Sequence, residues 1–158
     1  DVETEFRAEL GAGGMHHALA LLNARTRYRF TGVYRAEPPL LRNEFLFDRE
    51  NPLLALGGDT TELDQTYCGI VVATCAPFVA EDAPADIRLR DHAARESVVS
   101  YIGVPVRTLD GRIFGTLCHF DVRPRMLPTG EFAVLESIAS FLAGWLANRD
   151  MAVDRPSR

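Results

Sequence analysis

The chain has 158 residues, of which 47% are hydrophobic and 25% charged, with a formal net charge of -5. This length suits one domain, and the composition is that of an ordinary globular protein. Because the net charge is negative, nucleic acid and anionic lipid are poor electrostatic partners, and we expect neither a nucleic-acid nor a membrane partner. All basic charge is arginine, which excludes Schiff-base, P-loop and general-base lysines within this chain.

The cysteine content points to a reducing compartment. Three cysteines at irregular spacing do not form the even-numbered pattern of a disulfide framework. No apolar run has the length of a membrane span, and no signal-peptide pattern is present. We therefore expect a cytoplasmic protein. The first residue is Asp1 rather than methionine, which favours a fragment of a longer chain.

The N-terminal part predicts a helix followed by a hairpin. Residues 1–14 form a linker or short helix, because three glycines near its end are costly in a helix. Residues 15–25 place apolar side chains on one helical stripe. Two strands follow, at 28–36 and 40–47, and the Pro38-Pro39 pair between them predicts a hairpin with a longer loop.

The middle of the chain predicts a loop-rich layer. A short helix is expected over 63–73, with Asp64 as its N-cap. Residues 77–82 have the apolar, β-branched centre of a short strand. Residues 82–91 are polar and loop-like, and 92–96 are expected to form one helical turn.

The segment from 99 to 125 is the most informative. Two apolar runs rich in β-branched residues flank Asp110-Gly111, which predicts a hairpin whose turn has positive φ at both central positions. The second run is apolar on both alternating sets, so it should be a central strand with both faces covered. We expect helices on one face and the layer 53–96 on the other, with a pocket under that layer.

The C-terminal helix is expected to open with Thr129 as N-cap. Leu135, Ile138, Leu142 and Trp145 then follow at heptad-like spacing. This seam suggests a homodimer through the terminal helices. We place one domain at 15–149 and a tail or linker at 150–158.

These segments resemble the GAF domain family. The resemblance extends over residues 15–147, and its most specific pieces are Tyr67-Cys68, the run 79–83, the run 101–106 and the run 110–118. It implies an α+β fold with a central antiparallel β-sheet. The N- and C-terminal helices then lie on one face, and a layer of loops and a short helix covers a ligand pocket on the other.

The resemblance also implies a function: a non-catalytic, small-molecule-sensing module of a bacterial signal-transduction protein. The ligand state would pass through the terminal helices to an output domain. Bilin-binding members attach their chromophore through a Cys-His pair shortly before the final hairpin. The corresponding residues 93–98 contain no cysteine, so we do not expect a covalently bound bilin. Cyclic-nucleotide-binding members carry Asn-Lys and Asp-Glu pairs, where this chain has Val122-Arg123 and Glu131-Phe132. The missing pairs weaken the case for a cyclic nucleotide as the ligand without excluding it. The sequence identifies neither the ligand nor any cofactor.

Two alternatives remain open. The first is a thiol-dependent enzyme of the free methionine sulfoxide reductase type, because Cys68-Gly69 resembles the first cysteine of those enzymes. Their second cysteine has no counterpart between Ala76 and Leu117, and Cys75 lies two helical turns from Cys68. The second alternative is a purely structural dimerisation domain with a collapsed cavity.

Candidate site residues follow from chemistry and position. We expect no catalytic residue and no metal ligand, because no metal-ligand spacing, nucleophile elbow or glycine-rich phosphate loop occurs. Tyrosines and phenylalanine could form an aromatic pocket, an arginine could clamp an anion, and histidines could bind a ligand. Each also has a plain structural explanation: core packing for the aromatic residues, local ion pairs for the charged ones, and burial or solvation for the histidines. The predicted ligand-binding residues are Phe47, Tyr67, Cys68, Asp82, Arg88, His92, Tyr101 and His119.

Overall fold

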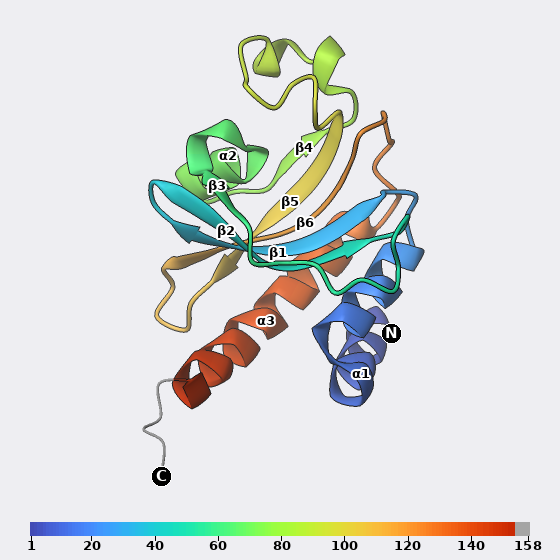
Figure 1. Ribbon diagram of the computed structural model, residues 1–158, viewed down its shortest axis with the longest axis vertical. Helices are drawn as coiled ribbons and strands as arrows, with labels where there is room; N and C mark the ends of the chain where they lie inside the picture. The colour runs from blue at the N-terminus through green and yellow to red at the C-terminus, as the bar shows by residue number, and fades with distance from the viewer. Residues whose placement is uncertain (154–158) are drawn as a thin grey trace.

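The computed structural model describes residues 1–153, and the side chains of residues 1–150. Of the predicted tail at 150–158, residues 150–153 continue the last helix, and 154–158 lie outside the described residues. A six-stranded antiparallel sheet forms the centre, in the order β3-β2-β1-β6-β5-β4. Two long helices cross one face, and a short helix and loops cover the other (Figure 1). This is the α+β architecture expected from the sequence.

The elements have the following bounds. The helices are α1 (Val2–Ala24), α2 (Tyr67–Thr74) and α3 (Glu131–Val153). The strands are β1 (Phe30–Glu37), β2 (Leu40–Asp48), β3 (Thr60–Glu62), β4 (Phe78–Ala80), β5 (Ser100–Arg107) and β6 (Ile113–Asp121). β6 lies between β1 and β5, so the prediction of a central strand is confirmed.

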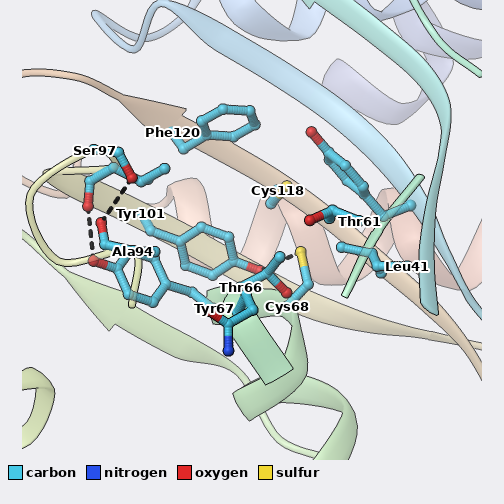
Figure 2. Close-up of a pocket in the computed structure, with 13 residues that line it drawn as sticks. Leu41, Thr61, Thr66, Tyr67, Cys68, Ala94, Ser97, Tyr101, Cys118 and Phe120 are labelled. Atoms are coloured by element: carbon cyan, nitrogen blue, oxygen red, sulfur yellow. Dashed lines mark hydrogen bonds between the residues drawn. The ribbon is translucent and has the colours of Figure 1, made fainter. Parts of the chain in front are cut away.

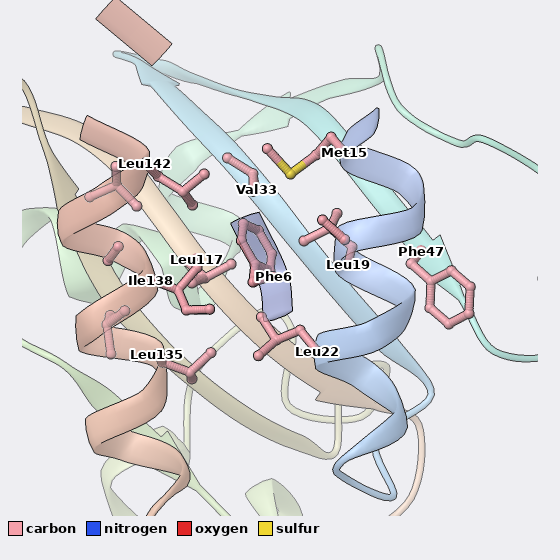
Figure 3. Packing of buried hydrophobic residues seen from close by; sticks show 14 of the residues in the cluster. Phe6, Met15, Leu19, Leu22, Val33, Phe47, Leu117, Leu135, Ile138 and Leu142 are labelled. Atoms are coloured by element: carbon pink, nitrogen blue, oxygen red, sulfur yellow. The ribbon is translucent and has the colours of Figure 1, made fainter. Parts of the chain in front are cut away.

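The larger hydrophobic core lies between the sheet and the two long helices (Figure 3). Leu135, Ile138 and Leu142 of α3 are fully buried there, against α1 and the sheet. Burying such a side chain stabilises the fold by about 1.5–3 kcal/mol. Three of the four residues of the heptad-like seam are therefore buried in the chain's own core, and Trp145 is partly buried against it.

The first helix continues through most of its glycines. α1 runs from Val2 to Ala24 with non-helical dihedral angles only at Gly14, where φ is 82° and ψ is -176°. Glycine adopts this conformation without a Cβ clash, and the helix bends at that residue. Phe6, before the bend, is fully buried in the same core as Leu19, after it.

Both hairpin connections differ from their predictions. The β1–β2 connection consists of Pro38 and Pro39 alone, not a longer loop. The β5–β6 connection comprises residues 108–112, and only Gly111 has a positive φ, of 85°. The predicted two-residue turn was wrong because the strands end before the Asp-Gly pair. Thr108 N donates to the Arg112 carbonyl oxygen at 2.7 Å and closes a wider loop instead.

Three smaller features complete the corrections. β3 was not predicted because all three of its residues are exposed and lack an apolar alternation. The N-cap of α2 is Thr66, while Asp64 lies in the 3₁₀ turn Leu63–Gln65 that precedes it. α3 begins at Glu131, so Gly130, and not Thr129, immediately precedes its first residue. Within residues 1–153, no helix combines the length and apolar character needed to cross a membrane.

Candidate functional site

A cavity of ≈ 190 Å³ lies between α2 and the sheet, on the face opposite α1 and α3 (Figure 2). β1, β2, β3, β5 and β6 contribute to its walls, together with the start of α2 and the loop at residues 94–98. The lining residues are Tyr34, Leu41, Thr61, Gln65, Thr66, Tyr67, Cys68, Ala94, Ser97, Val98, Tyr101, Cys118 and Phe120. The cavity therefore forms where the sequence analysis expected a pocket, under the loop-rich layer.

The lining is apolar with neutral polar groups. Hydroxyl groups come from threonine, serine and tyrosine side chains, and one amide comes from Gln65. Among the lining residues that the structure describes, none carries an Asp, Glu, Arg or His side chain. Since an unpaired charge is costly to remove from water, this environment suits an uncharged guest. The volume is below the roughly 300–1,000 Å³ of sites for drug-sized ligands.

Local hydrogen bonds hold α2 over the cavity. The Thr66 hydroxyl oxygen accepts from Gly69 N at 3.2 Å and caps the helix. A Cβ at Gly69 would collide with the Leu63 carbonyl oxygen, so only glycine allows this close approach. The Tyr67 hydroxyl donates to the Val98 carbonyl oxygen at 2.8 Å and ties α2 to the loop on the other side of the cavity.

Cys68 lies at the centre of a buried polar cluster. Its Sγ is 3.2 Å from the Tyr101 hydroxyl and 3.1 Å from Thr116 Oγ1, and Cys118 lies in the same buried cluster. Burial alone would raise the pKa of the Cys68 thiol, but hydrogen bonds from Cys118, Thr116 and Tyr101 outweigh it, and the pKa falls below its usual value. Burial also raises the pKa of Cys118 and of Tyr101 well above their usual ranges.

Of the predicted site residues, Tyr67, Cys68 and Tyr101 meet in this cavity. The Tyr67 and Tyr101 ring centroids are 5.5 Å apart in an edge-on arrangement. Phe47 instead lies on the helix side of the sheet, 5.5 Å from the His16 ring (Figure 3). The structure does not bring Phe47 to the cavity.

The predicted residues in the roof segment also lie outside the lining. Arg88 donates to Asp86 and to the Val79 carbonyl oxygen, and its guanidinium carbon is 4.7 Å from the Phe78 ring centroid. These contacts within the protein occupy the Arg88 guanidinium. The hydrogen bond from Arg88 holds the pKa of Asp86 below its usual value. Asp82 is exposed.

His92 lies behind Tyr67, with 4.8 Å between their ring centroids. Its Nδ1 accepts from Ala94 N at 3.0 Å. It supports the wall from outside and is not part of the lining.

His119 lies on the helix side and is fully buried. Its Nδ1 pairs with Thr31 Oγ1 at 2.7 Å, and its Nε2 pairs with the Glu131 carboxylate at 2.9 Å. The Tyr28 ring stacks on it at 5.5 Å between centroids. Burial lowers the pKa of His119 although Glu131 acts in the opposite direction. This histidine therefore connects β6 to the first residue of α3 rather than to the cavity.

Several lining residues that come from strands were not predicted from the sequence. Cys118, Tyr34, Leu41 and Phe120 line the cavity but are not among the predicted ligand-binding residues. A signal for Cys118 and Phe120 was available, because residues two apart on a strand share a face and Thr116 also belongs to that set. The alternation along the strand does not show which face of β6 borders the cavity. Within the described part of the chain, no group of three potential metal ligands occurs.

Comparison with protein families identifies the chain. A family model described as "GAF domain" matches residues 15–144. The chain belongs to the GAF domain family. No curated protein matches it.

Solved structures with low sequence identity have the same fold. The GAF domain of an Acinetobacter phosphoenolpyruvate-protein phosphotransferase is 14% identical, covers 98% of this chain and 96% of its own, and has a TM-score of 0.75. A free methionine-R-sulfoxide reductase from Neisseria meningitidis, solved with its substrate, is 20% identical, covers 96% and 87%, and has a TM-score of 0.69. A type II enzyme of that kind from Thermoplasma acidophilum is 21% identical, covers 91% and 94%, and has a TM-score of 0.61.

Proposed function

We propose that this GAF domain is a non-catalytic, small-molecule-sensing module of a bacterial signal-transduction protein, located in the cytoplasm, with the cavity under α2 as its binding site. The observation that carries the proposal is the ≈ 190 Å³ space itself, which is lined by uncharged side chains and roofed by a short capped helix. A collapsed structural domain would fill this space with side chains. The cavity therefore favours binding over a purely structural role.

The lining defines the ligand class. We infer a small, uncharged molecule with an apolar body and one or more hydroxyl, carbonyl or amide groups. Tyr34, Thr61 and Gln65 bring polar atoms to the cavity without charge. The predicted arginine clamp is unsupported as a source of affinity, because Arg88 is already paired with Asp86 outside the lining.

The geometry supports a relay from the cavity to the chain ends. β6 contributes Cys118 to the cavity and His119 to the network beneath α1 and α3. A ligand that binds one packing of these layers better than another would shift their populations. An output domain attached beyond the terminal helices would receive that shift. A homodimer is also proposed, but its contacts would come from surfaces other than the buried seam of α3.

A thiol-dependent reductase is the second candidate, favoured by the buried Cys68 and by the fold shared with free methionine-R-sulfoxide reductases. Free methionine sulfoxide carries both an ammonium and a carboxylate group. The lining has no charged side chain among the described residues to pair with either, which weighs against this substrate. A reductant-coupled assay on free methionine sulfoxide, with Cys68→Ser as its control, decides the matter: turnover that is lost in the variant would establish the enzyme.

The sensor proposal is tested by looking for a bound guest. Native mass spectrometry of protein purified without denaturation should show a retained small molecule, or a panel of neutral metabolites should raise the melting temperature. The matched pair Ala94→Phe and Ala93→Phe separates cavity binding from surface effects. Ala94 lines the cavity, while its neighbour Ala93 is exposed and does not. The ligand response should vanish in the first variant and persist in the second.

A further inference from the structure

Two thiols from distant parts of the chain meet at one cavity. Cys68 is in the first turn of α2, and Cys118 is in the middle of β6. Both side chains line the cavity, and both are buried within the same side-chain cluster. In Figure 2 the two side chains project from helix and strand toward the same space. No other described element places a cysteine there, since Cys75 is exposed at the C-terminal end of α2.

The surroundings make the two thiols chemically different. Cys68 Sγ lies within hydrogen-bonding distance of two hydroxyl groups, those of Tyr101 at 3.2 Å and Thr116 at 3.1 Å. The Tyr101 hydroxyl keeps its proton, because its burial raises its pKa, and can donate to a Cys68 thiolate. Hydrogen bonds to the charged form favour a thiolate, and the thiolate is the nucleophile. Cys118 remains a protonated thiol in the reduced protein, because burial raises its pKa.

We propose that Cys68 and Cys118 form a site of oxidative modification, at which a small hydroperoxide entering the cavity converts the two thiols into a disulfide. The oxidant is neutral and polar, as the lining requires. The proposal goes beyond ligand sensing and does not depend on it.

The chemistry balances in two steps. The Cys68 thiolate attacks the terminal oxygen of the hydroperoxide, the S–O bond forms, the O–O bond breaks, and the departing alkoxide or hydroxide takes up a proton. Cys118 then loses its proton and attacks the sulfenic sulfur of Cys68, so that the S–S bond forms, the S–O bond breaks and water leaves. Two thiols lose two electrons in total, and the peroxide bond accepts them.

The product would join α2 covalently to β6. Such a bond would hold the roof against the sheet across the space that a guest needs. The oxidised protein should therefore lose the capacity of its cavity for ligand.

The experiment uses the full chain in a Cys75→Ser background, which removes the exposed thiol, with hydrogen peroxide as the probe. Non-reducing peptide mapping should find the peptides of Cys68 and Cys118 cross-linked, and dithiothreitol should release them. In Cys118→Ala the reaction should stop at a sulfenic acid on Cys68 that dimedone traps. In Cys68→Ala, dimedone should not label Cys118, the one cysteine that remains. Circular dichroism melts verify that each variant is folded, and Cys118→Ser serves as a second variant should alanine unfold the protein.

Access is tested separately in the chain with all three cysteines. Ala94→Phe, which occupies the cavity, should slow oxidation of Cys68 while leaving oxidation of the exposed Cys75 unchanged. Ala93→Phe should slow neither. The proposal is overturned if folded protein treated with hydrogen peroxide keeps Cys68 and Cys118 as free thiols, or if they react only under conditions that unfold it. Ligand-induced stabilisation of reduced protein reports on the sensor proposal alone, so the two failures are distinguishable.

Discussion

Cys118 and His119 are consecutive residues of β6 whose side chains lie on opposite faces of the sheet. Cys118 faces the cavity, whereas His119 binds Thr31 and the Glu131 carboxylate on the helix side. Both are fully buried. A displacement of β6 caused by a guest would therefore act directly on the start of α3, through a hydrogen bond of 2.9 Å.

The His119 network should make stability depend on pH. Because burial lowers the pKa of His119 in the folded state, the unfolded chain binds a proton more readily below its ordinary pKa of 6.5. Stability from this group is therefore complete above pH 6.5 and falls as the pH decreases, by at most about 1.4 kcal/mol per pH unit. Glu131 opposes the shift, while the charges of Arg25 and Arg49 add to it.

Urea unfolding at pH 7.5 and pH 5.5 checks this sign. His119→Gln should cost about 1–3 kcal/mol at pH 7.5, because buried polar partners lose a hydrogen bond. It should also flatten the pH dependence relative to the unmodified chain. A stability that increases on acidification through this window would contradict the prediction.

Asp48 should contribute stability through its ion pair. Hydrogen bonds from Arg29, together with those from Asn51 and Glu50 N, lower its pKa from 3.8 to about 2. Its side chain is 5% exposed, so Asp48→Asn should cost about 2 kcal/mol at pH 7. The contribution is complete above pH 3.8 and disappears as the pH falls through about 2. The difference between the variant and the unmodified chain, followed by denaturant unfolding, should shrink over that range.

The cap of α2 should control the stability of the cavity roof. Thr66→Val keeps the shape of the side chain and removes the acceptor for Gly69 N, which should cost about 1 kcal/mol. Asp64→Ala, at the cap position expected from the sequence alone, should change little. Thermal unfolding compares the two, and amide hydrogen exchange of α2 should accelerate in the first variant only. Equal losses would assign the capping role to both residues.

Two glycines should respond in opposite ways to the same substitution. A Cβ at Gly115 of β6 would lie far inside van der Waals contact distance of the Tyr34 carbonyl oxygen, so Gly115→Ala should cost about 3 kcal/mol or more. A Cβ at Gly144 of α3 meets open space, and Gly144→Ala should stabilise the protein by about 0.5–1 kcal/mol. The melting temperatures of the two variants, compared with that of the unmodified chain, show whether one substitution destabilises the protein and the other stabilises it.

Filling the cavity should cost little stability. Ala94→Phe places a ring where there is space, so its melting temperature should stay closer to that of the unmodified chain than overpacking of a solid core would allow. Ala93→Phe, on the surface, serves as the reference. A severe loss in Ala94→Phe alone would show that the side chains around this space cannot accept a guest.

Local patterns in the sequence predicted most of the elements, and the resemblance to the GAF domain family supplied their arrangement. The apolar stripe of 15–25, the two-sided apolar run of β6 and the seam of α3 each predicted an element that the structure contains. They succeed because helix and strand periodicities report directly on which faces are buried. The hairpin around Asp110-Gly111 is present but its predicted turn was wrong, since a dipeptide does not determine where the flanking strands stop pairing.

The composition of the site depended on contacts between distant segments. Strand periodicity places the side chains of Cys118 and His119 on opposite faces, but it does not show which of them faces the cavity, because both faces of β6 are buried. Nor does spacing along the chain relate Cys68 to Cys118, whose meeting requires α2 to pack across β6. Sequence alone determined which residues alternate and which are apolar. The tertiary structure decided which of these faces was left partly unfilled, because a cavity is a property of how layers pack together and not of any one segment.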